Sequence, residues 1–416
     1  MSTAQVDREE EKAVRQAARL LYICDFPPSN AAGGSILLSR LLESYPPERL
    51  IVLTGSHASK ISTAAGRLRC TQITFPTSKG WGRWGLGRIR NLLDWLRLPF
   101  LTFLSIHLIR RHSIEAMVTL FHGRFYLAAC AAARLTRTPY VAFVHDDYVS
   151  DKRSMWRRAL YLATRTAARH AAHIYAVSSG MQEKLRFEFA VDSEVQLPAT
   201  KAHFKEFPET NRKLKNESLL IVYAGSITNA VEDSVRLLVE IITNGMLKDY
   251  GIPSAKFHLF TSLKPDQVRA WGWDHPDVQL SPWISQAEIP KALSQADILF
   301  LPFSFCDDVR NLIETAFPSK TADYLASGRP VLVFGPKYSS LVRYASEEGF
   351  AEVVDEFNPV ALAEGIRKIA LSPVQQNRLA ARSLEIFSRN HDIERQQNQF
   401  QLLVRKIVRE GRENVS

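Results

Sequence analysis

A lysine, an aspartate and a glycine in residues 317–331 have the types and spacing of a site for an anionic, hydroxyl-rich ligand. Pro318 and Ser319 are typical of a helix start, since Pro is tolerated in the first turn and a Ser hydroxyl can cap backbone N–H groups. Lys320 adds a positive charge beside these N–H groups and the positive end of the helix dipole. This helix start could therefore hold a diphosphate without a metal ion.

Asp323 follows Lys320 by three residues, so a helix places both side chains on nearly the same face. Its carboxylate could accept hydrogen bonds from two ribose hydroxyls, one turn behind the phosphate. Gly328 indicates the end of the helix, and residues 330–334 are typical of a buried strand. The pattern predicts a site for a sugar nucleotide, whereas a solvated surface helix is the alternative.

This stretch resembles the donor-site signature of glycosyltransferase family 4, within the GT-B superfamily of glycosyltransferases. The matching residues are Lys320, Asp323, Tyr324, Ala326, Gly328, Pro330 and Val331, with Asp in place of the commoner Glu. The resemblance implies an α/β protein of two Rossmann-like doubly wound domains that face each other across a cleft. It also implies metal-independent transfer of a hexose from a nucleotide-diphosphate-sugar to a hydroxyl of a glycan or lipid-linked glycan, with retention of anomeric configuration.

The resemblance assigns further roles near this signature. Eight positions before Asp323, relatives carry a Glu, whereas this chain has Thr315, so Glu314 is the nearest candidate for a catalytic carboxylate. Relatives also follow the glycine at position 225 with a pair of basic residues that is missing here. Lys320, also a catalytic candidate, and Arg310 could meet the phosphate charge instead, and Arg310 as a plain surface charge remains open.

Glycines and polar residues that follow predicted strands complete the donor site. Paired glycines bring backbone close to a ligand, and the carboxyl ends of strands are where ligands bind in open α/β sheets. Relatives contact the nucleotide base near a residue that corresponds to Trp283, although a buried Trp is the competing interpretation. The predicted donor-binding residues are Gly33, Gly34, Gly225, Asn229, Trp283, Arg310, Ser319, Lys320 and Asp323.

His145 follows the predicted strand at 140–144 and is the remaining catalytic candidate. Its imidazole could contact the transferred sugar or assist the acceptor hydroxyl, and relatives carry a His in the corresponding stretch. A structural His is the alternative. Metal binding by Asp146 and Asp147 is less consistent with the resemblance, because similar enzymes offset the diphosphate charge with helix ends and basic side chains. We therefore expect no metal and no cofactor besides the donor substrate.

Length and composition indicate a globular protein of two domains. The 416 residues exceed the roughly 250–300 at which single hydrophobic cores stop growing. The four cysteines have no spacing that indicates a zinc site or a disulfide framework, which favours a reducing compartment. Residues 1–16 are polar and charged, so we expect a disordered leader and no signal peptide. These features predict a cytoplasmic protein.

The segment 79–112 combines basic, aromatic and aliphatic residues. Residues 1–200 contain 27 Lys and Arg against 16 Asp and Glu, and residues 201–416 contain 26 against 27, so the whole net charge belongs to the first half. Segment 79–112 has many Arg and Lys side chains beside one acid, Asp94. Its apolar run at 98–109 is shorter than the roughly 20 residues that span a bilayer. The segment therefore predicts peripheral association with an anionic membrane on its inner face, and a long helix packed on the first sheet is the alternative. No recognition motif indicates nucleic acid.

Apolar runs alternate with helical segments, as two doubly wound parallel sheets require. We expect an N-terminal acceptor-binding domain at 17–196, a linker at 197–217, and a C-terminal nucleotide-sugar-binding domain at 218–390. The resemblance implies that a last helix, in 391–416, crosses back to the first domain. The expected strands are 20–24, 50–54, 116–120, 140–144 and 173–177, then 219–224, 257–261, 278–280, 298–301, 331–334 and 351–354.

Two other functions stay open at the level of sequence. A nucleotide-sugar epimerase uses the same paired domains without a separate acceptor, and it needs its own acid and base pair. A non-catalytic sugar-nucleotide-binding protein would explain the missing basic pair and the displaced Glu314. Fold resemblance alone does not decide among these functions.

Overall fold

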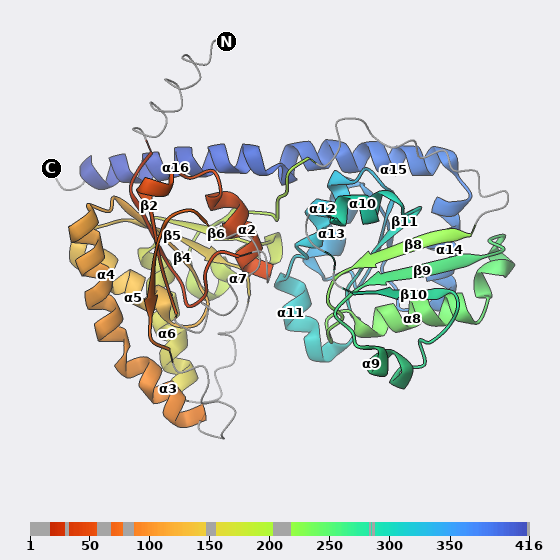
Figure 1. Ribbon diagram of the computed structural model, residues 1–416, viewed down its shortest axis with the longest axis horizontal. Helices are drawn as coiled ribbons and strands as arrows, with labels where there is room; N and C mark the ends of the chain where they lie inside the picture. The colour runs from red at the N-terminus through yellow and green to blue at the C-terminus, as the bar shows by residue number, and fades with distance from the viewer. Residues whose placement is uncertain are drawn as a thin grey trace, which may run out of the picture. The chain divides into compact units, whose positions relative to one another are not determined.

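The computed structural model describes residues 17–29, 33–55, 68–77, 87–146, 155–202, 218–282, 284 and 288–413. The chain forms two compact units, unit 1 (Met1–Gln196 and Ile393–Ser416) and unit 2 (Leu197–Asp392). Each unit has a parallel sheet with helices on its faces (Figure 1).

The sheet of unit 1 has the strand order β3-β2-β1-β4-β5-β6-β7, and neighbouring strands pair in parallel. The chain runs outward from β1 to β3 and then adds β4 on the other side of β1. The order therefore reverses between β1 and β4. The strands are β1 (Leu20–Ile23), β2 (Leu50–Gly55), β3 (Thr71–Phe75), β4 (Ala116–Leu120), β5 (Tyr140–Val144), β6 (His173–Ala176) and β7 (Glu194–Val195).

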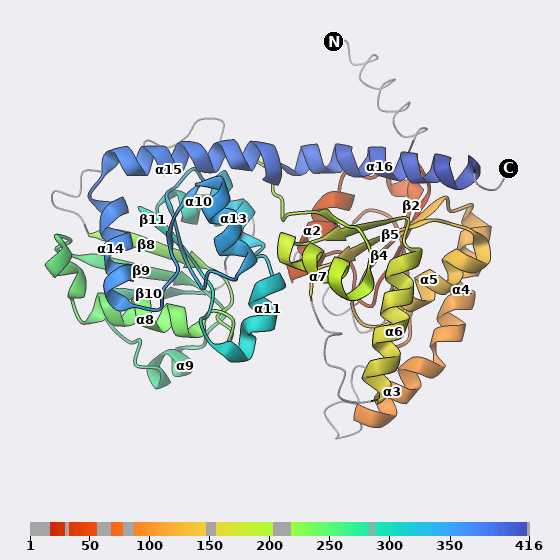
Figure 2. The same cartoon turned by 180° about the vertical axis from the view of Figure 1, so that it is seen from behind.

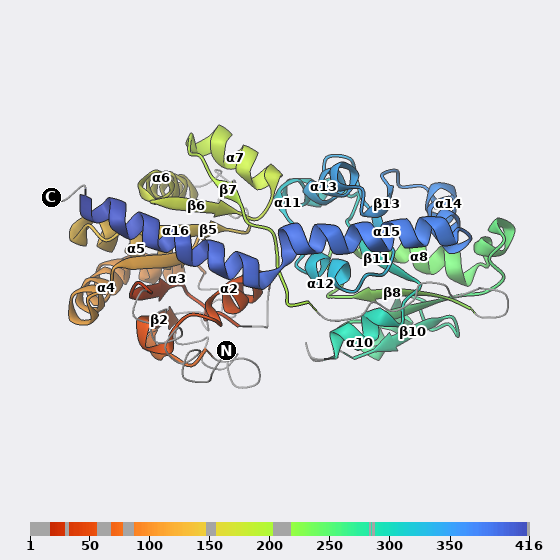
Figure 3. The same cartoon turned by 90° about the horizontal axis from the view of Figure 1, so that it is seen from above.

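Helices cover this sheet and close its core. In the view from behind, α5 and α6 lie side by side (Figure 2), and they pack against each other. The last helix, α16, lies along α2 (Figure 3) and buries Phe400, Val404 and Ile407 in the core of unit 1. Each such side chain contributes about 1.5–3 kcal/mol by burial. The helices are α2 (Gly33–Leu42), η1 (Pro47–Arg49), α3 (Gly87–Leu96), α4 (Leu98–His112), α5 (Phe125–Thr136), α6 (Met155–His170), α7 (Ser179–Phe189) and α16 (Ile393–Glu413).

The sheet of unit 2 repeats this plan with the order β10-β9-β8-β11-β12-β13, again paired in parallel. The order reverses between β8 and β11. Continuous apolar runs form the central strands because helices on both faces bury them. The strands are β8 (Leu219–Ala224), β9 (Ala255–Phe260), β10 (Val278–Ser281), β11 (Ile298–Pro302), β12 (Val331–Phe334) and β13 (Ala351–Val354).

Local signals fix several helix ends in unit 2. The side chain of Asn358 caps α14, and Gly328 takes a left-handed conformation (φ +63°) after Ser327, the residue that ends α12. The helices are α8 (Glu232–Thr243), η4 (Met246–Tyr250), α9 (Pro265–Ala270), α10 (Ile289–Ser294), η5 (Asp307–Val309), α11 (Arg310–Thr315), α12 (Lys320–Ala326), α13 (Ser340–Glu348), α14 (Pro359–Ala370), α15 (Pro373–Ile386) and η6 (Phe387–His391).

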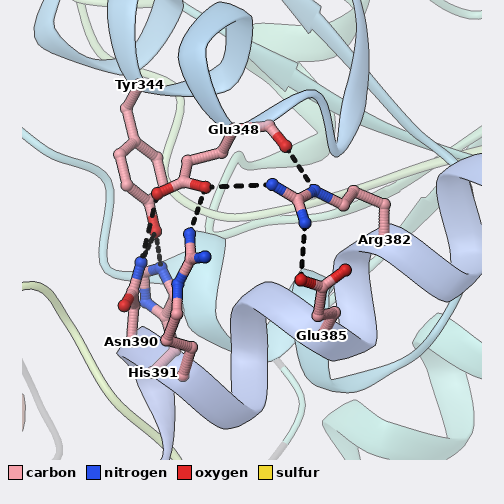
Figure 4. A network of polar contacts seen from close by, with 7 residues as sticks. Tyr344, Glu348, Arg382, Glu385, Asn390 and His391 are labelled. Carbon is pink, nitrogen blue, oxygen red and sulfur yellow. Dashed lines mark hydrogen bonds and ion pairs between the residues drawn. The ribbon is translucent and has the colours of Figure 1, made fainter.

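A polar network holds the end of unit 2 where the chain leaves for α16 (Figure 4). The buried His391 is hydrogen-bonded through Nδ1 to the carbonyl of Pro198 (2.6 Å) and through Nε2 to the hydroxyl of Tyr344 (3.0 Å). Burial lowers the pKa of His391 to about 4. Thr200 pairs with Asp392 in a parallel bridge. A neutral histidine thus ties the two segments by which the chain enters and leaves unit 2.

The expected α/β class with two doubly wound sheets is confirmed. Every expected strand is present, with ends that differ by at most two residues. Two further strands, β3 and β7, were not expected. The strand β3 reads Thr-Gln-Ile-Thr-Phe and lies at the sheet edge with no fully buried residue, and β7 has only two residues. Neither offers the continuous apolar run by which buried strands are identified.

Candidate functional site

Both units place candidate residues at the carboxyl edge of a parallel sheet. In open α/β sheets, ligands bind outside the carboxyl ends of the strands, at the point where the strand order reverses. That point lies between β8 and β11 in unit 2 and between β1 and β4 in unit 1. The residues that follow these strands are therefore the first candidates for a site.

Lys320 begins α12 and lies against the end of β8. Its Nζ donates a hydrogen bond to the Tyr223 hydroxyl (2.7 Å) and lies 4.0 Å from the centre of the Tyr223 ring. The Tyr223 hydroxyl donates to the carbonyl of Ser226 (2.8 Å). Burial lowers the pKa of Lys320 to about 7. Within the described residues no carboxylate pairs with this amine, so an anionic ligand would supply its missing counter-charge.

Gly225 makes room for this lysine. A Cβ at position 225 would lie 2.4 Å from Nζ of Lys320 and 3.1 Å from the hydroxyl of Tyr223. The hydroxyl of Tyr324, on α12, accepts a hydrogen bond from the backbone N–H of Ala224 (2.9 Å). The start of α12 is thus held against the end of β8, and only a residue without a side chain allows this close approach at position 225.

Ser319 does not cap α12 as expected. It has a helical backbone conformation (φ −60°, ψ −28°), and its hydroxyl makes no capping hydrogen bond. A capping residue usually has an extended backbone, which lets its side chain reach the free N–H groups of the first turn. The prediction of a Ser cap is therefore wrong, although Ser319 still lies beside Lys320 at the helix start. Asp323 lies one turn further along α12 and is partly buried.

Arg310 and Glu314 form an ion pair on α11, with 3.1 Å between Nε and Oε1. The Arg310 guanidinium also lies 4.4 Å from the ring centre of Tyr338. The hydrogen bond to Glu314 raises the pKa of Arg310 above its ordinary value. The sequence assigned these two residues to separate parts of the ligand, whereas the structure pairs them with each other. A phosphate would compete with Glu314 for the guanidinium.

The other predicted donor residues are placed as follows. Gly33 and Gly34 form the first turn of α2 in unit 1, and not a loop that precedes a helix near position 36. The first four N–H groups of a helix have no partner within the helix, and those of both glycines are among them. Asn229 is exposed in the connection between β8 and α8. Trp283 lies outside the described residues.

His145 lies directly after β5 and is buried, with 9% of its surface exposed. Burial lowers its pKa to about 4, so the imidazole is neutral near pH 7. Asp146 follows it, and burial raises the pKa of this carboxyl group. Asp147 lies outside the described residues. A neutral imidazole at a strand end can hydrogen-bond to a sugar hydroxyl, but its low pKa makes it a weak proton acceptor.

The sequence did not reveal a second polar pair in unit 1. Nδ1 of His122 lies 3.0 Å from Oδ1 of Asp25. Asp25 follows β1 and His122 follows β4, two strands that are adjacent and parallel. The signal that could have found this pair is the position of each residue just after a strand. This position indicates that two residues are close together only when the order of the strands in the sheet is known.

Among the described residues, no group of three or more His, Cys, Asp or Glu side chains is arranged to hold a metal ion.

Unit 1 also exposes a row of apolar side chains on α3 and α4. This apolar stripe consists of Leu92, Leu96, Phe100 and Phe103, and the two Phe side chains are 71% and 72% exposed. By length and composition, the 21 residues Leu92–His112 could cross a membrane; they comprise the end of α3 and all of α4, so the apolar stretch is longer than the run at 98–109 suggested. The opposite face of α4 is buried in unit 1, through Leu101, Ser105, Leu108 and Ile109.

Two family profiles match this chain. The family described as Glycosyl transferase 4-like domain matches residues 40–198, and the family described as Glycosyl transferases group 1 matches residues 218–371. A search of curated proteins finds no match.

Solved structures with a similar fold span nearly the whole chain. HepE from Anabaena, solved in complex with UDP and glucose, is 14% identical with a TM-score of 0.62, over 92% of this chain and 98% of its own. Sucrose-phosphate synthase from Thermosynechococcus elongatus is 13% identical with a TM-score of 0.65, over 94% and 99%. A UDP-forming α,α-trehalose-phosphate synthase from Burkholderia vietnamiensis is 12% identical with a TM-score of 0.60, over 94% and 100%.

Proposed function

Since this chain belongs to the group 1 glycosyltransferases of GT-B architecture, we propose that it transfers a hexose from a nucleotide-diphosphate-sugar to a hydroxyl of a glycan or lipid-linked glycan. Retention of anomeric configuration and independence of a metal ion are parts of this proposal. HepE, a structural neighbour, was solved with UDP-glucose, which supports a sugar nucleotide as the donor.

The environment of Lys320 is the observation that carries the proposal. A partly buried amine with a lowered pKa, beside a glycine at the reversal point of a parallel sheet, is suited to a phosphate. Charge grows on the diphosphate as the bond to the sugar breaks, and a fixed cation stabilises that charge most in a site from which water is excluded. Lys320 would act as this cation, and Asp323 would hold the ribose.

The remaining predicted residues complete the mechanism as proposals. Arg310 would leave Glu314 to bind phosphate oxygens, which would free the Glu314 carboxylate for the sugar. Gly33 and Gly34 would direct the first N–H groups of α2 toward the diphosphate, and His145 would hydrogen-bond to a sugar hydroxyl. In such a reaction the protein chiefly positions both substrates and stabilises the leaving group.

Thermal unfolding with a panel of nucleotide sugars tests the proposal. A ligand that binds the native protein raises its stability by about 2.7 kcal/mol at a concentration one hundred times Kd. We expect one UDP-, GDP- or ADP-sugar to raise Tm equally with EDTA and with Mg²⁺, and Lys320→Met to remove that rise. The control Lys256→Met changes an exposed lysine on β9 and should respond like the wild type. If no nucleotide sugar raises Tm, the proposal is wrong.

Measurements of donor turnover distinguish a glycosyltransferase from an epimerase and from a binding protein. The bound donor should be consumed when a glycan or lipid-linked acceptor is added. Conversion of the donor to an isomeric sugar nucleotide without an acceptor would indicate an epimerase. Binding with no turnover against a broad acceptor panel would indicate a binding protein.

A peripheral position on the inner face of an anionic membrane is the proposed setting, with a role in polysaccharide or cell-envelope synthesis. The apolar stripe could enter the boundary between headgroups and acyl chains, and the exposed Arg110 and Arg111 could meet lipid phosphates. Its buried opposite face favours a helix that lies on a membrane over one that spans it.

Vesicle binding tests this setting. The double variant Phe100→Asp/Phe103→Asp should reduce partitioning onto phosphatidylglycerol vesicles at least about tenfold, since each Phe contributes about 1.5–3 kcal/mol when buried. Phe187→Asp, on α7, alters a side chain that is 91% exposed and lies outside the stripe, so it serves as the control. Equal binding of the double variant and the control would contradict a membrane role for the stripe.

A further inference from the structure

The helices α4 and α5 both begin at the carboxyl edge of the unit 1 sheet. Each leads into a strand of this parallel sheet, α4 into β4 and α5 into β5, so each helix ends at the amino edge of the sheet. The two helices pack against each other. Arg124 directly precedes α5 and follows β4, beside which the strand order reverses. Open α/β sheets bind their ligands at this edge, so the polar side chains at the two helix starts are candidates for a site.

Asp94 and Arg97 continue the buried face of α4 toward the start of α5. The backbone stays helical where α3 meets α4, because the N–H of Arg97 donates to the carbonyl of Leu93 (3.0 Å) and the N–H of Leu101 donates to the carbonyl of Arg97 (3.0 Å). Asp94, Arg97 and the buried Leu101 therefore share one face. On this face Oδ2 of Asp94 lies 3.2 Å from Nη1 of Arg124. The face is thus directed at the residue that precedes α5.

Two buried N–H donors at this place lack an acceptor. Nε1 of Trp95 and Nη1 of Arg97 are buried atoms that have no hydrogen-bond partner within the described part of the chain. The guanidinium of Arg97 has no ion-pair partner there either. The guanidinium of Arg124 stacks over Trp95, 5.2 Å from the ring centre. Buried donors without an acceptor are rare in native proteins, and a ligand that supplies the acceptor atoms is one explanation of them.

The charges of this cluster, which consists of Asp94, Trp95, Arg97 and Arg124, favour an anion. Two guanidinium groups, which are always protonated in proteins, stand beside the single carboxylate of Asp94. Guanidinium groups bind phosphate oxygens through paired hydrogen bonds, and an indole N–H is a further donor. The side chain of Arg124 does not cap α5, so the first N–H groups of that helix face the same ligand. Such a set of donors suits a phosphate group, which has several acceptor oxygens.

We propose that this cluster binds a phosphate group of the acceptor; this inference rests on the proposed glycosyltransferase function. The acceptor is then a phosphate ester, either a soluble sugar phosphate or a lipid phosphate, and its phosphate is a handle that takes no part in the transfer. Arg97 supplies the unpaired cation, Trp95 supplies an N–H donor, and Arg124 is shared between the phosphate and Asp94. All four residues belong to unit 1, so the site is complete within that unit.

Calorimetric titration of the Lys320→Met variant tests this site, because that substitution removes the proposed phosphate ligand of unit 2. The probes are glucose 6-phosphate and octyl phosphate, and glucose and octanol are their neutral counterparts. We expect at least one of the two phosphates to bind and neither neutral compound to do so. Adding Arg97→Gln should raise Kd at least about tenfold, and adding Trp95→Phe should raise it about threefold. Arg134→Gln, which alters an exposed arginine near the end of α5, is the control and should leave Kd unchanged.

A stability measurement shows whether the substitution leaves the fold intact. Because Arg97 has no side-chain partner in the described part of the chain, the Tm of Arg97→Gln without ligand should be no lower than that of the control. A tighter complex with glucose 6-phosphate would identify a soluble sugar phosphate, and a tighter complex with octyl phosphate would identify a lipid phosphate. If neither phosphate binds, or if Arg97→Gln binds it as tightly as Arg134→Gln does, the proposal is wrong.

The two proposals fail separately. The panel of nucleotide sugars tests the glycosyltransferase function through Lys320 in unit 2, whereas the phosphate titration is made without that lysine and needs no turnover. If no nucleotide sugar binds the wild type, the cluster loses its role in acceptor binding even where a phosphate binds to it. If a nucleotide sugar binds the wild type and neither phosphate binds Lys320→Met, only the phosphate site in unit 1 is overturned.

Discussion

The two units share one architecture but carry different chemistry at the same place in it. In both, the strand order reverses beside the first strand of the sheet, between β1 and β4 or between β8 and β11. The edge of unit 1 presents the acids and imidazoles of Asp25, His122, His145 and Asp146. The edge of unit 2 presents the amine of Lys320. The fold supplies a position, and the side chains placed there decide the ligand.

Each edge also uses a glycine to admit its functional group. A Cβ at Gly123 would lie 2.6 Å from the Asp25 carboxylate, and a Cβ at Gly225 would lie 2.4 Å from the Lys320 amine. The two glycines differ in backbone conformation, because only Gly123 has a positive φ. Position 123 therefore requires glycine for both space and backbone conformation, whereas position 225 requires it for space alone.

The largest expected effect is the loss of turnover when the Lys320 amine of unit 2 is removed. Lys320→Met should lower donor turnover by about 10²–10³-fold, the range for loss of one group that stabilises transition-state charge. His122→Gln should leave donor binding intact, whereas Lys320→Met should abolish the donor-induced rise in Tm. If both variants lose donor binding equally, the division of roles between the edges is wrong.

Lys320→Met should not lower the stability of the folded protein. The pKa of Lys320 falls from an ordinary 10.5 to about 7 on folding, so the unfolded chain binds this proton more tightly. The resulting penalty on stability is full below pH 7 and is relieved as the pH rises toward 10.5. We expect Lys320→Met to have a Tm at pH 7 that is at least as high as that of the wild type, in calorimetry without ligand. A clear loss of Tm would indicate a structural lysine.

The pH dependence of donor binding should follow the protonation of Lys320 in unit 2. Protonated Lys320 binds a diphosphate better than neutral Lys320, so Kd should rise by up to about tenfold for each pH unit above 7. Titration calorimetry between pH 6 and 9 measures this slope, and Lys320→Met should flatten it. His145 stays neutral between pH 5 and 8 because its pKa is about 4, so His145→Gln should not change the slope.

The glycines provide a smaller, structural comparison. Gly123→Ala places a side chain at a left-handed position and against a buried carboxylate, which should cost about 1–2 kcal/mol. Gly225→Ala would meet the end of the Lys320 side chain and the Tyr223 hydroxyl without a backbone penalty, so it should cost less stability than Gly123→Ala while donor affinity falls. Denaturant unfolding of both variants checks this order. Equal stability losses would contradict the contrast drawn between the two edges.

Arg310→Ala should have the smallest effect. Arg310 is exposed and already paired with Glu314, so it gives up one partner when it binds a phosphate. We expect donor Kd to rise less than about tenfold and Tm to stay close to that of the wild type, because an ion pair on the surface contributes little to stability. A loss as large as that of Lys320→Met would make Arg310 the principal phosphate ligand.

Sequence patterns predicted the strands better than the site. Apolar runs located β1 and β8 because residues buried on both faces of a parallel sheet must be apolar without interruption. The edge strand β3 was not predicted by this criterion because none of its side chains is fully buried, so its sequence is not continuously apolar. The predicted cap by Ser319 was wrong. A Ser side chain can cap a helix only where its backbone is extended, and the residue type alone does not determine that backbone conformation.

By itself, the sequence determined the alternation of strands and helices, the start of α12 near Lys320 and its end at Gly328, because these depend on local propensity and burial. Only the tertiary structure decided which strand ends meet. Lys320 lies 97 residues from Tyr223, and His122 lies 97 residues from Asp25. Both contacts exist because β8 or β1 stands at the centre of a parallel sheet, where neighbours in space come from distant parts of the chain. No local pattern encodes that strand order, and so none could pair the amine with its tyrosine or the imidazole with its carboxylate.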